Sequence, residues 1–104
     1  MTDRQQKIEE VLRTLGANFL EKESNRTSLI TITKVSVSPD LKNATFFISV
    51  LPNNKETDAL NFAKRQRKSL REFLKKNMNI KQIPFVDFEI DLGEKNRQRI
   101  DELL

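Results

Sequence analysis

The fold is decided by residues 56–78, ETDALNFAKRQRKSLREFLKKNM, in which an apolar pattern and a basic pattern share the same turns. Both recur at steps of three and four residues, so they predict a helix that packs one face and presents the other. If this helix is continuous, its cations occupy roughly a third of the circumference, opposite the apolar side. The apolar side consists of Ala59, Phe62, Ala63, Gln66, Leu70, Phe73 and Leu74, and the basic side of Lys64, Arg67, Lys68, Arg71 and Lys75.

The basic side is almost free of acids. From Lys64 to Lys76 there are seven Lys and Arg and one acid, Glu72, so the segment carries a net charge of +6, against +4 for the whole chain. Charged helix faces are usually only solvated, but they then mix both signs at four-residue spacing. The imbalance therefore favours a polyanionic partner such as RNA. The candidate RNA-binding residues are Lys64, Arg65, Arg67, Lys68, Arg71, Lys75, Lys76 and Lys81, with Arg4, Lys7, Arg13, Lys34 and Lys42 as weaker candidates.

Composition limits the kind of protein that this chain can be. Its 104 residues are 37% hydrophobic and 33% charged, which suits one folded domain. No apolar run reaches the length of a membrane span, and residues 1–16 do not resemble a secretory signal, so we expect a cytoplasmic protein that does not bind membranes. The absence of His and Cys removes the usual base of a hydrolytic triad and the usual zinc ligands. We expect no catalytic residues, no metal or other cofactor, and no small-molecule substrate.

Two strands precede the organising helix. Residues 29–38 and 44–51 are rich in β-branched side chains and alternate with period two, which predicts strands. The segment PDLKN, residues 39–43, suits a tight connection, so we expect an antiparallel hairpin. The first strand changes the face that it buries near Lys34, which predicts a bulge there.

The remaining elements complete the domain. Residues 3–22 follow helical spacing, and residues 85–92, after Pro84, alternate as a third strand. A helical crossover between the second and third strands places both helices on one face of the sheet. We therefore predict an α+β fold: a single two-layer, monomeric domain over residues 1–104, in which helices cover a three-stranded sheet. Residues 93–104 would form a short helical or frayed tail.

The third strand is expected to have one apolar side and one acidic side. Val86, Phe88, Ile90 and Leu92 should pack, whereas Phe85, Asp87, Glu89 and Asp91 should lie on the other face. The carboxylates follow one another about 7 Å apart along a strand, which is loose for one metal ion. We therefore expect them to be solvated, or paired with basic groups of the same chain, and not to form a metal or acid–base site.

Several motifs resemble those of a known family, the bacterial ribosome-binding factor A proteins. The family's hairpin signature is similar to TKVSVSPDLKNATFFISVL, residues 33–51, with matches at Val35, Val37, Ser38, Asp40, Leu41 and Ala44. A second signature is similar to IPFVDFEID, residues 83–91, with matches at Pro84, Phe88 and Asp91. Arg71 and Leu74 match a further Arg and Leu in the long helical stretch. The order and spacing of these motifs extend the resemblance over residues 4–104.

The resemblance implies a type II KH-like fold in which two helices meet at a kink instead of a GxxG loop. It also implies a non-enzymatic assembly factor that binds the immature, free small (30S) ribosomal subunit and its 16S rRNA. Such a factor assists late maturation, including processing of the 16S rRNA 5′ end, and leaves before translation begins. Phosphate contacts by Lys and Arg that recognise the shape of the rRNA are the expected mechanism.

Two questions stay open at this point. The kink of the family commonly carries Ala-x-Gly, whereas the corresponding positions here hold Gln66, Arg67 and Lys68. Either Lys68 tolerates the bend or the helix runs straighter, because the freedom of a glycine is missing. The alternative function is a protein-interaction module that docks an acidic partner through its basic helix. An enzyme would have to use carboxylates such as Asp87 or Asp91, and nothing in the sequence indicates an enzymatic activity.

Overall fold

The computed structural model describes residues 3–23 and 28–93. Their elements follow the predicted order, and the long helix is interrupted where the resemblance implies a kink. Of the tail expected over residues 93–104, all but Gly93 lies outside the described residues. The elements are α1 (Asp3–Glu23), β1 (Leu29–Val37), β2 (Asn43–Leu51), a short 3₁₀ turn η1 (Asn53–Lys55), α2 (Glu56–Arg65), α3 (Arg67–Asn77) and β3 (Phe85–Ile90).

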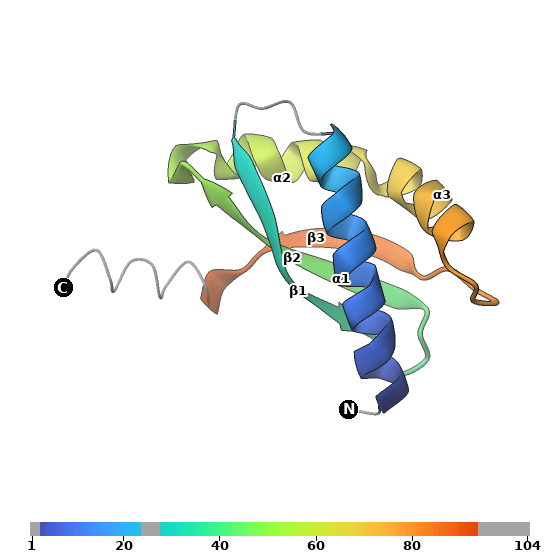
Figure 1. Ribbon diagram of the computed structural model, residues 1–104. Helices are drawn as coiled ribbons and strands as arrows, with labels where there is room; N and C mark the ends of the chain where they lie inside the picture. The colour runs from blue at the N-terminus through green and yellow to red at the C-terminus, as the bar shows by residue number, and fades with distance from the viewer. Residues whose placement is uncertain (1–2, 24–27, 94–104) are drawn as a thin grey trace.

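The sheet has the order β1-β2-β3, with β1 antiparallel to β2 and β2 parallel to β3. The parallel pair is joined by α2 and α3, which form the predicted helical crossover. Figure 1 shows α2 and α3 along the top of the sheet, with α1 crossing in front of it. The predicted α+β architecture of a three-stranded sheet and a helical layer is therefore confirmed.

The predicted bulge in β1 is present. Pairing with β2 moves from Ile32 opposite Ile48 to Lys34 opposite Phe47, which leaves Thr33 as the extra residue. The side-chain hydroxyl oxygen of Thr33 lies 3.2 Å from the Phe47 carbonyl oxygen. The extra residue restores the buried face of the strand, because Ile32 is buried before the bulge and Val35 and Val37 are buried after it.

The core lies between the sheet and the helices and draws on all the major elements. Leu12 of α1, Leu70 and Leu74 of α3, and Phe46 and Phe88 of β2 and β3 are fully buried. The rings of Phe46 and Phe88 pack with centroids 5.5 Å apart. Because a fully buried side chain of this size contributes about 1.5–3 kcal/mol, this set fixes how the helices sit on the sheet.

Gly16 allows α1 to approach the sheet closely. A Cβ atom at this position would lie 2.7 Å from a ring carbon of Phe46 and 2.9 Å from Cδ1 of Ile32. Both neighbours are buried core side chains, so neither can move away without opening the core. A side chain at residue 16 would therefore push α1 off the sheet.

The long helix is interrupted at Gln66. This residue has φ −91° and ψ 3°, and its N–H points back to the carbonyls of Ala63 and Lys64. A negative φ is open to any residue, so the break needs no glycine. Lys68, where the family commonly has Gly, lies inside the first turn of α3. The helix over residues 56–78 is therefore not continuous, so its cations do not form one basic side as predicted. The two halves of the basic segment belong to separate helices.

The end of β3 differs from the sequence prediction. The last described bond toward β2 is the Asp91 N–H donating to the Ile48 carbonyl at 2.8 Å, and the strand itself ends at Ile90. Beyond that point the alternation of faces stops. Leu92, predicted to pack, is 65% exposed, whereas Asp91, predicted on the acidic face, is buried and accepts a hydrogen bond from the Thr33 hydroxyl.

Candidate nucleic-acid interface

The eight predicted RNA-binding residues divide into two sets according to their partners. In one set the cationic group is held by β3 or by the loop before it. In the other set the group is exposed and forms no salt bridge with a residue in 3–23 or 28–93, apart from one loose pair within α3. The held set is Lys64, Arg67 and Arg71, and the exposed set is Arg65, Lys68, Lys75, Lys76 and Lys81.

Arg71 is half-buried and ties α3 to the start of β3. Its Nε donates to the Pro84 carbonyl and its Nη2 to the Ile83 carbonyl, each at 3.1 Å. Its guanidinium also lies 4.6 Å from the ring centroid of Phe85, which is a cation–π distance. Ile83 and Pro84 are both buried, so their carbonyls depend on such donors. The Arg71 side chain therefore stabilises the contact between α3 and the loop before β3.

Arg67 stabilises the break in the long helix. Its Nε donates to the Lys64 carbonyl at 3.0 Å, one of the acceptors that the interruption leaves without a helical partner. Its Nη1 lies 3.3 Å from Oδ1 of Asp87, and Nζ of Lys64 lies 3.4 Å from the same oxygen. The expected pairing of a β3 carboxylate with basic groups of the same chain is confirmed for Asp87.

Asp87 remains ionised in this arrangement. Its partial burial alone would raise the pKa, but the Phe88 N–H bond and the charges of Lys64 and Arg67 together outweigh it and hold the pKa of Asp87 below its ordinary value. The carboxylate thus offsets part of the positive charge at the α2–α3 break. Since all three side chains are about half exposed, this pairing contributes little to stability.

The exposed set forms the candidate interface. Arg65 is the last residue of α2, and Lys68 lies in the first turn of α3. Lys76 lies in the last turn of α3 and Lys81 in the loop that follows. Lys75 approaches Glu72 at 4.0 Å, the limit of an ion pair. These groups keep their charge and their freedom to reach a phosphate, which is what electrostatic binding of a nucleic acid requires.

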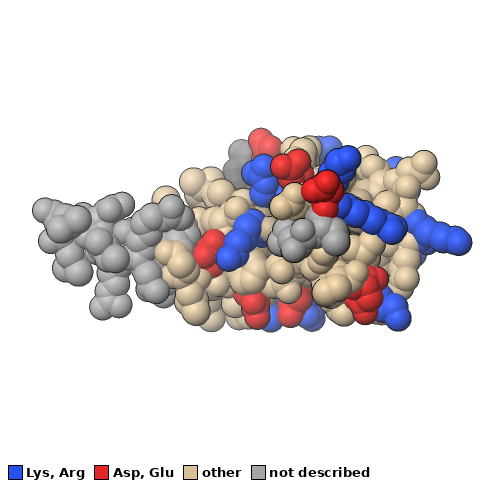
Figure 2. Space-filling view, turned by 90° about the horizontal axis from the view of Figure 1, so that it is seen from below, with Lys and Arg blue, Asp and Glu red and all other residues tan. Residues whose placement is uncertain are grey.

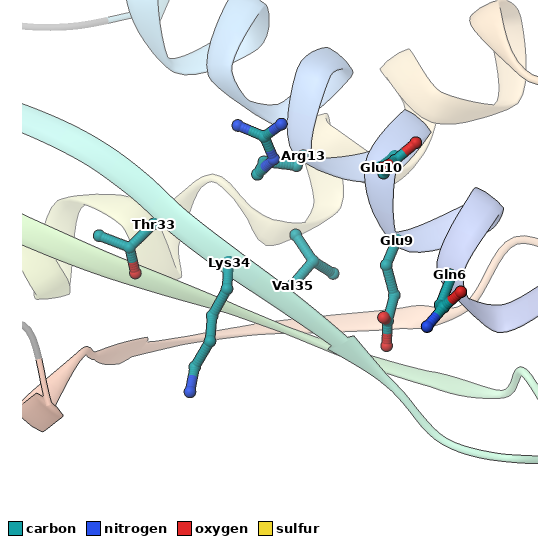
Figure 3. A pocket seen from close by; sticks show the side chains of 7 residues that line it. All are labelled: Gln6, Glu9, Glu10, Arg13, Thr33, Lys34 and Val35. Atoms are coloured by element: carbon teal, nitrogen blue, oxygen red, sulfur yellow. The ribbon is translucent and has the colours of Figure 1, made fainter. Parts of the chain in front are cut away.

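Two other parts of the described surface carry charges of both signs. Figure 2 shows the molecule from below, away from α2, where basic and acidic side chains are interspersed. A cleft of about 420 Å³ between α1 and β1 is also mixed, since Glu9, Glu10 and Arg13 of α1 and Lys34 of β1 line it (Figure 3). Glu9 extends from α1 to accept the Val37 N–H at 2.8 Å, so this acid covers the edge of β1.

The structure adds two roles that the sequence analysis missed, the cap of Arg67 on α2 and the bonds of Arg71 to the loop before β3. The only signal in the sequence is that both residues are Arg, whose forked guanidinium can bridge several acceptors, in a segment otherwise rich in Lys. Among residues 3–23 and 28–93 no group of His, Cys, Asp or Glu side chains is arranged to hold a metal ion. Within the same ranges no helix has the length and apolar character that a membrane span needs.

The fold and the exposed cations define a KH-like domain with a basic helical surface. The chain belongs to the ribosome-binding factor A family, because the model of the family described as "Ribosome-binding factor A" matches residues 4–104. It is 32% identical over 106 residues to the ribosome-binding factor A of Coxiella burnetii (strain Dugway 5J108-111), an alignment that covers 100% of this chain and 89% of the relative.

Solved structures of low identity support the fold alone. The crystal structure of ribosome-binding factor A from Thermus thermophilus superposes with a TM-score of 0.75 at 18% identity, covering 83% of this chain and 94% of that one. A homology model of the Thermus thermophilus factor, fitted into a cryo-EM map of a 30S–ribosome-binding factor A complex, gives a TM-score of 0.63 at 18% identity. That alignment covers 86% of this chain and 93% of that chain.

Proposed function

We propose that this protein is a ribosome assembly factor that binds the immature small ribosomal subunit and its 16S rRNA. It assists late maturation, including processing of the 16S rRNA 5′ end, and acts as a monomeric, cytoplasmic binding protein without catalysis of its own. Membership of the ribosome-binding factor A family and the 30S complex described for a relative support this proposal. The observation that carries it is the set of exposed cations on α2, α3 and the following loop, which the acids of the described chain leave largely unbalanced.

The mechanism is electrostatic positioning. Each Lys or Arg that contacts a phosphate releases counterions from the RNA, and such contacts set orientation without reading the base sequence. Arg65 belongs to α2, and Lys68, Lys75 and Lys76 belong to α3, so phosphate contacts can be made from both helices that meet at the break. Recognition would then depend on the folded shape of the rRNA.

The test is co-sedimentation of the protein with purified immature and mature small subunits over a series of salt concentrations. In one variant Arg65, Lys68 and Lys76 are changed to Gln, which keeps helix propensity and leaves Arg67 and Arg71 in place. We expect the wild type to sediment with the immature subunit. The variant should bind more weakly, with a slope of log affinity against log salt that is shallower by about 2 to 3.

The matched control changes Lys7, Arg13 and Lys22 of α1 to Gln, so that the net charge falls equally on another surface. If the two variants lose the same affinity, binding depends on overall charge and the proposed surface is wrong. If the wild type binds neither particle but binds an acidic protein with a weak salt dependence, the protein-interaction module becomes the better interpretation, because a few ion pairs release few counterions.

A further inference from the structure

The hairpin motif Ser38-Pro39-Asp40-Leu41 has no role in the interface described above. Figure 1 shows the turn between β1 and β2 at the same end of the molecule as the N-terminal half of α1 and the loop after α3. These three segments enclose a cleft of about 170 Å³, well below the roughly 300–1,000 Å³ of sites that take a whole drug-sized ligand. Its walls include Arg4, Ile8, Asp40, Leu41, Ile80 and Lys81.

The turn fixes the position of the Asp40 carboxylate. Oδ1 of Asp40 accepts hydrogen bonds from the Ser38 hydroxyl at 2.6 Å and from the Lys42 N–H at 3.1 Å. The Ser38 hydroxyl oxygen in turn accepts the Asn43 N–H at 3.0 Å. Oδ2 accepts no hydrogen bond from the part of the chain that the structure describes. One oxygen thus holds the turn, and Asp40 also lines the cleft.

The same turn places an apolar side chain in the wall. Leu41 has φ 61°, a left-handed conformation that costs energy for a residue other than glycine. Its N–H donates to the Ser38 carbonyl at 2.8 Å, and its side chain packs against the core beside the cleft. The other apolar wall groups, Ile8 and Ile80, come from α1 and from the loop after α3. An unusual backbone conformation therefore completes a pocket with apolar sides.

The positive and negative charges around the cleft come from different segments of the chain. Arg4 and Lys81 are exposed, come from different segments, and form no salt bridge with Asp40. The bond from Ser38 and then that from the Lys42 N–H hold the pKa of Asp40 below its ordinary value, so the carboxylate stays ionised at neutral pH. The cleft thus combines a fixed carboxylate, apolar walls and two exposed cations, which are three different requirements for holding one nucleotide.

We propose that this cleft binds a single unstacked base of single-stranded RNA. The apolar walls cover the faces of the base, Oδ2 of Asp40 accepts a hydrogen bond from its amino group, and Arg4 and Lys81 contact the neighbouring phosphates. Cytosine, adenine and guanine offer such an amino group, whereas the imino N–H of uracil lies between two carbonyl oxygens that a carboxylate repels. The inference rests on the proposed function, because it takes RNA to be the ligand.

The experiment measures the binding of the whole chain to four pentaribonucleotides, UUUUU, UUCUU, UUAUU and UUGUU, which differ in one base. Fluorescence anisotropy gives the affinities, and amide NMR shifts at Leu41 and Lys42 report where the base lies. We expect at least one amino-bearing pentamer to bind about tenfold more tightly than UUUUU. Equal affinities for all four would overturn the proposal.

Two variants separate the roles of the cleft. Asp40→Asn keeps an oxygen for the turn but introduces an NH₂ group that donates, so the preference over UUUUU should disappear while the amide spectrum stays folded. The pair Arg4→Gln and Lys81→Gln should weaken all four pentamers alike. If Asp40→Asn keeps the preference, the base site is wrong.

The outcome also separates this inference from the proposed function. Binding to the immature subunit together with no pentamer binding overturns the base site and leaves the assembly role standing. Failure to bind either ligand overturns both.

Discussion

Lys68 and Arg71 lie three residues apart on α3, yet their side chains make different contacts. Arg71 is half-buried and donates to two carbonyls before β3, whereas Lys68 is exposed and forms no salt bridge within the described residues. The same division runs through the whole basic segment, because Arg67 and Lys64 share the Asp87 carboxylate while Arg65 does not. Positive charge in the sequence is therefore a poor measure of positive charge that is available to a ligand.

The division follows from the position of β3. It is an edge strand, and the helices that pack over it have side chains long enough to reach its border. The cations that reach this edge contact a carboxylate or a carbonyl, whereas the exposed set forms no salt bridge with β3 within the described residues. The held cations contact groups of the fold, and we propose that the exposed cations contact RNA. Changing one set at a time therefore tests the comparison.

The largest effect is expected for Arg71→Ala. This change removes two hydrogen bonds from a charged donor and leaves the buried carbonyls of Ile83 and Pro84 short of donors. We expect the free energy of unfolding to fall by about 2–3 kcal/mol. Urea denaturation at neutral pH measures it.

Lys68→Ala is the matched control for Arg71→Ala, since it makes the same truncation on the same helix. Its free energy of unfolding should change by no more than about 0.5 kcal/mol. Equal losses for the two variants would mean that the Arg71 contacts contribute nothing and that the division into two sets is wrong.

Most of the fold could be predicted because its signals are local. The alternation in β1 and β2 indicated the hairpin, and the loss of alternation near Lys34 indicated the bulge that the pairing confirms at Thr33. The crossover followed from the order of the elements. The end of β3 was misjudged, because Asp91 continues the alternation in sequence while the strand it should extend stops at Ile90.

The candidate site could be predicted only as a list of charges. Which cations are held depends on contacts such as Arg67 with Asp87, twenty residues apart, and no spacing rule within a helix reports a partner on another element. The break at Gln66 has no signal in the composition, since Gln is an ordinary helix former and a φ of −91° is open to any residue; only the resemblance to the family indicated a kink at residues 66–68. Sequence thus predicted a basic surface, and tertiary packing determines which of its cations stay exposed.

A smaller effect is expected when the shared carboxylate is neutralised. Asp87→Asn keeps an oxygen for the Phe88 N–H but releases Lys64 and Arg67 from their ion pairs. We expect affinity for small-subunit RNA to rise by up to about fivefold at low salt, because an exposed unit charge near 4 Å is worth about 1 kcal/mol. Filter binding at two salt concentrations measures the change.

Glu89→Gln provides the control for Asp87→Asn. Glu89 is exposed on the same strand and forms no salt bridge within residues 3–23 and 28–93, so its replacement removes the same charge without releasing a cation. A smaller gain for Glu89→Gln supports the held set as latent binding groups. Equal gains would show that only the net charge matters.

The smallest effect concerns pH. The pKa of Asp87 is lowered in the folded protein from its ordinary value of 3.8, so the ionised form binds protons less readily than in the unfolded chain. Its contribution to stability is therefore complete at pH values above 3.8 and is lost as the pH falls through the lower folded pKa. Asp87→Asn lacks this contribution at every pH. The difference in unfolding free energy between the two proteins should be below about 1 kcal/mol near pH 6, since the groups are half exposed, and should shrink toward pH 3. Urea denaturation across this range measures it, and a difference that grew on acidification would mean that Lys64 and Arg67 do not stabilise the carboxylate.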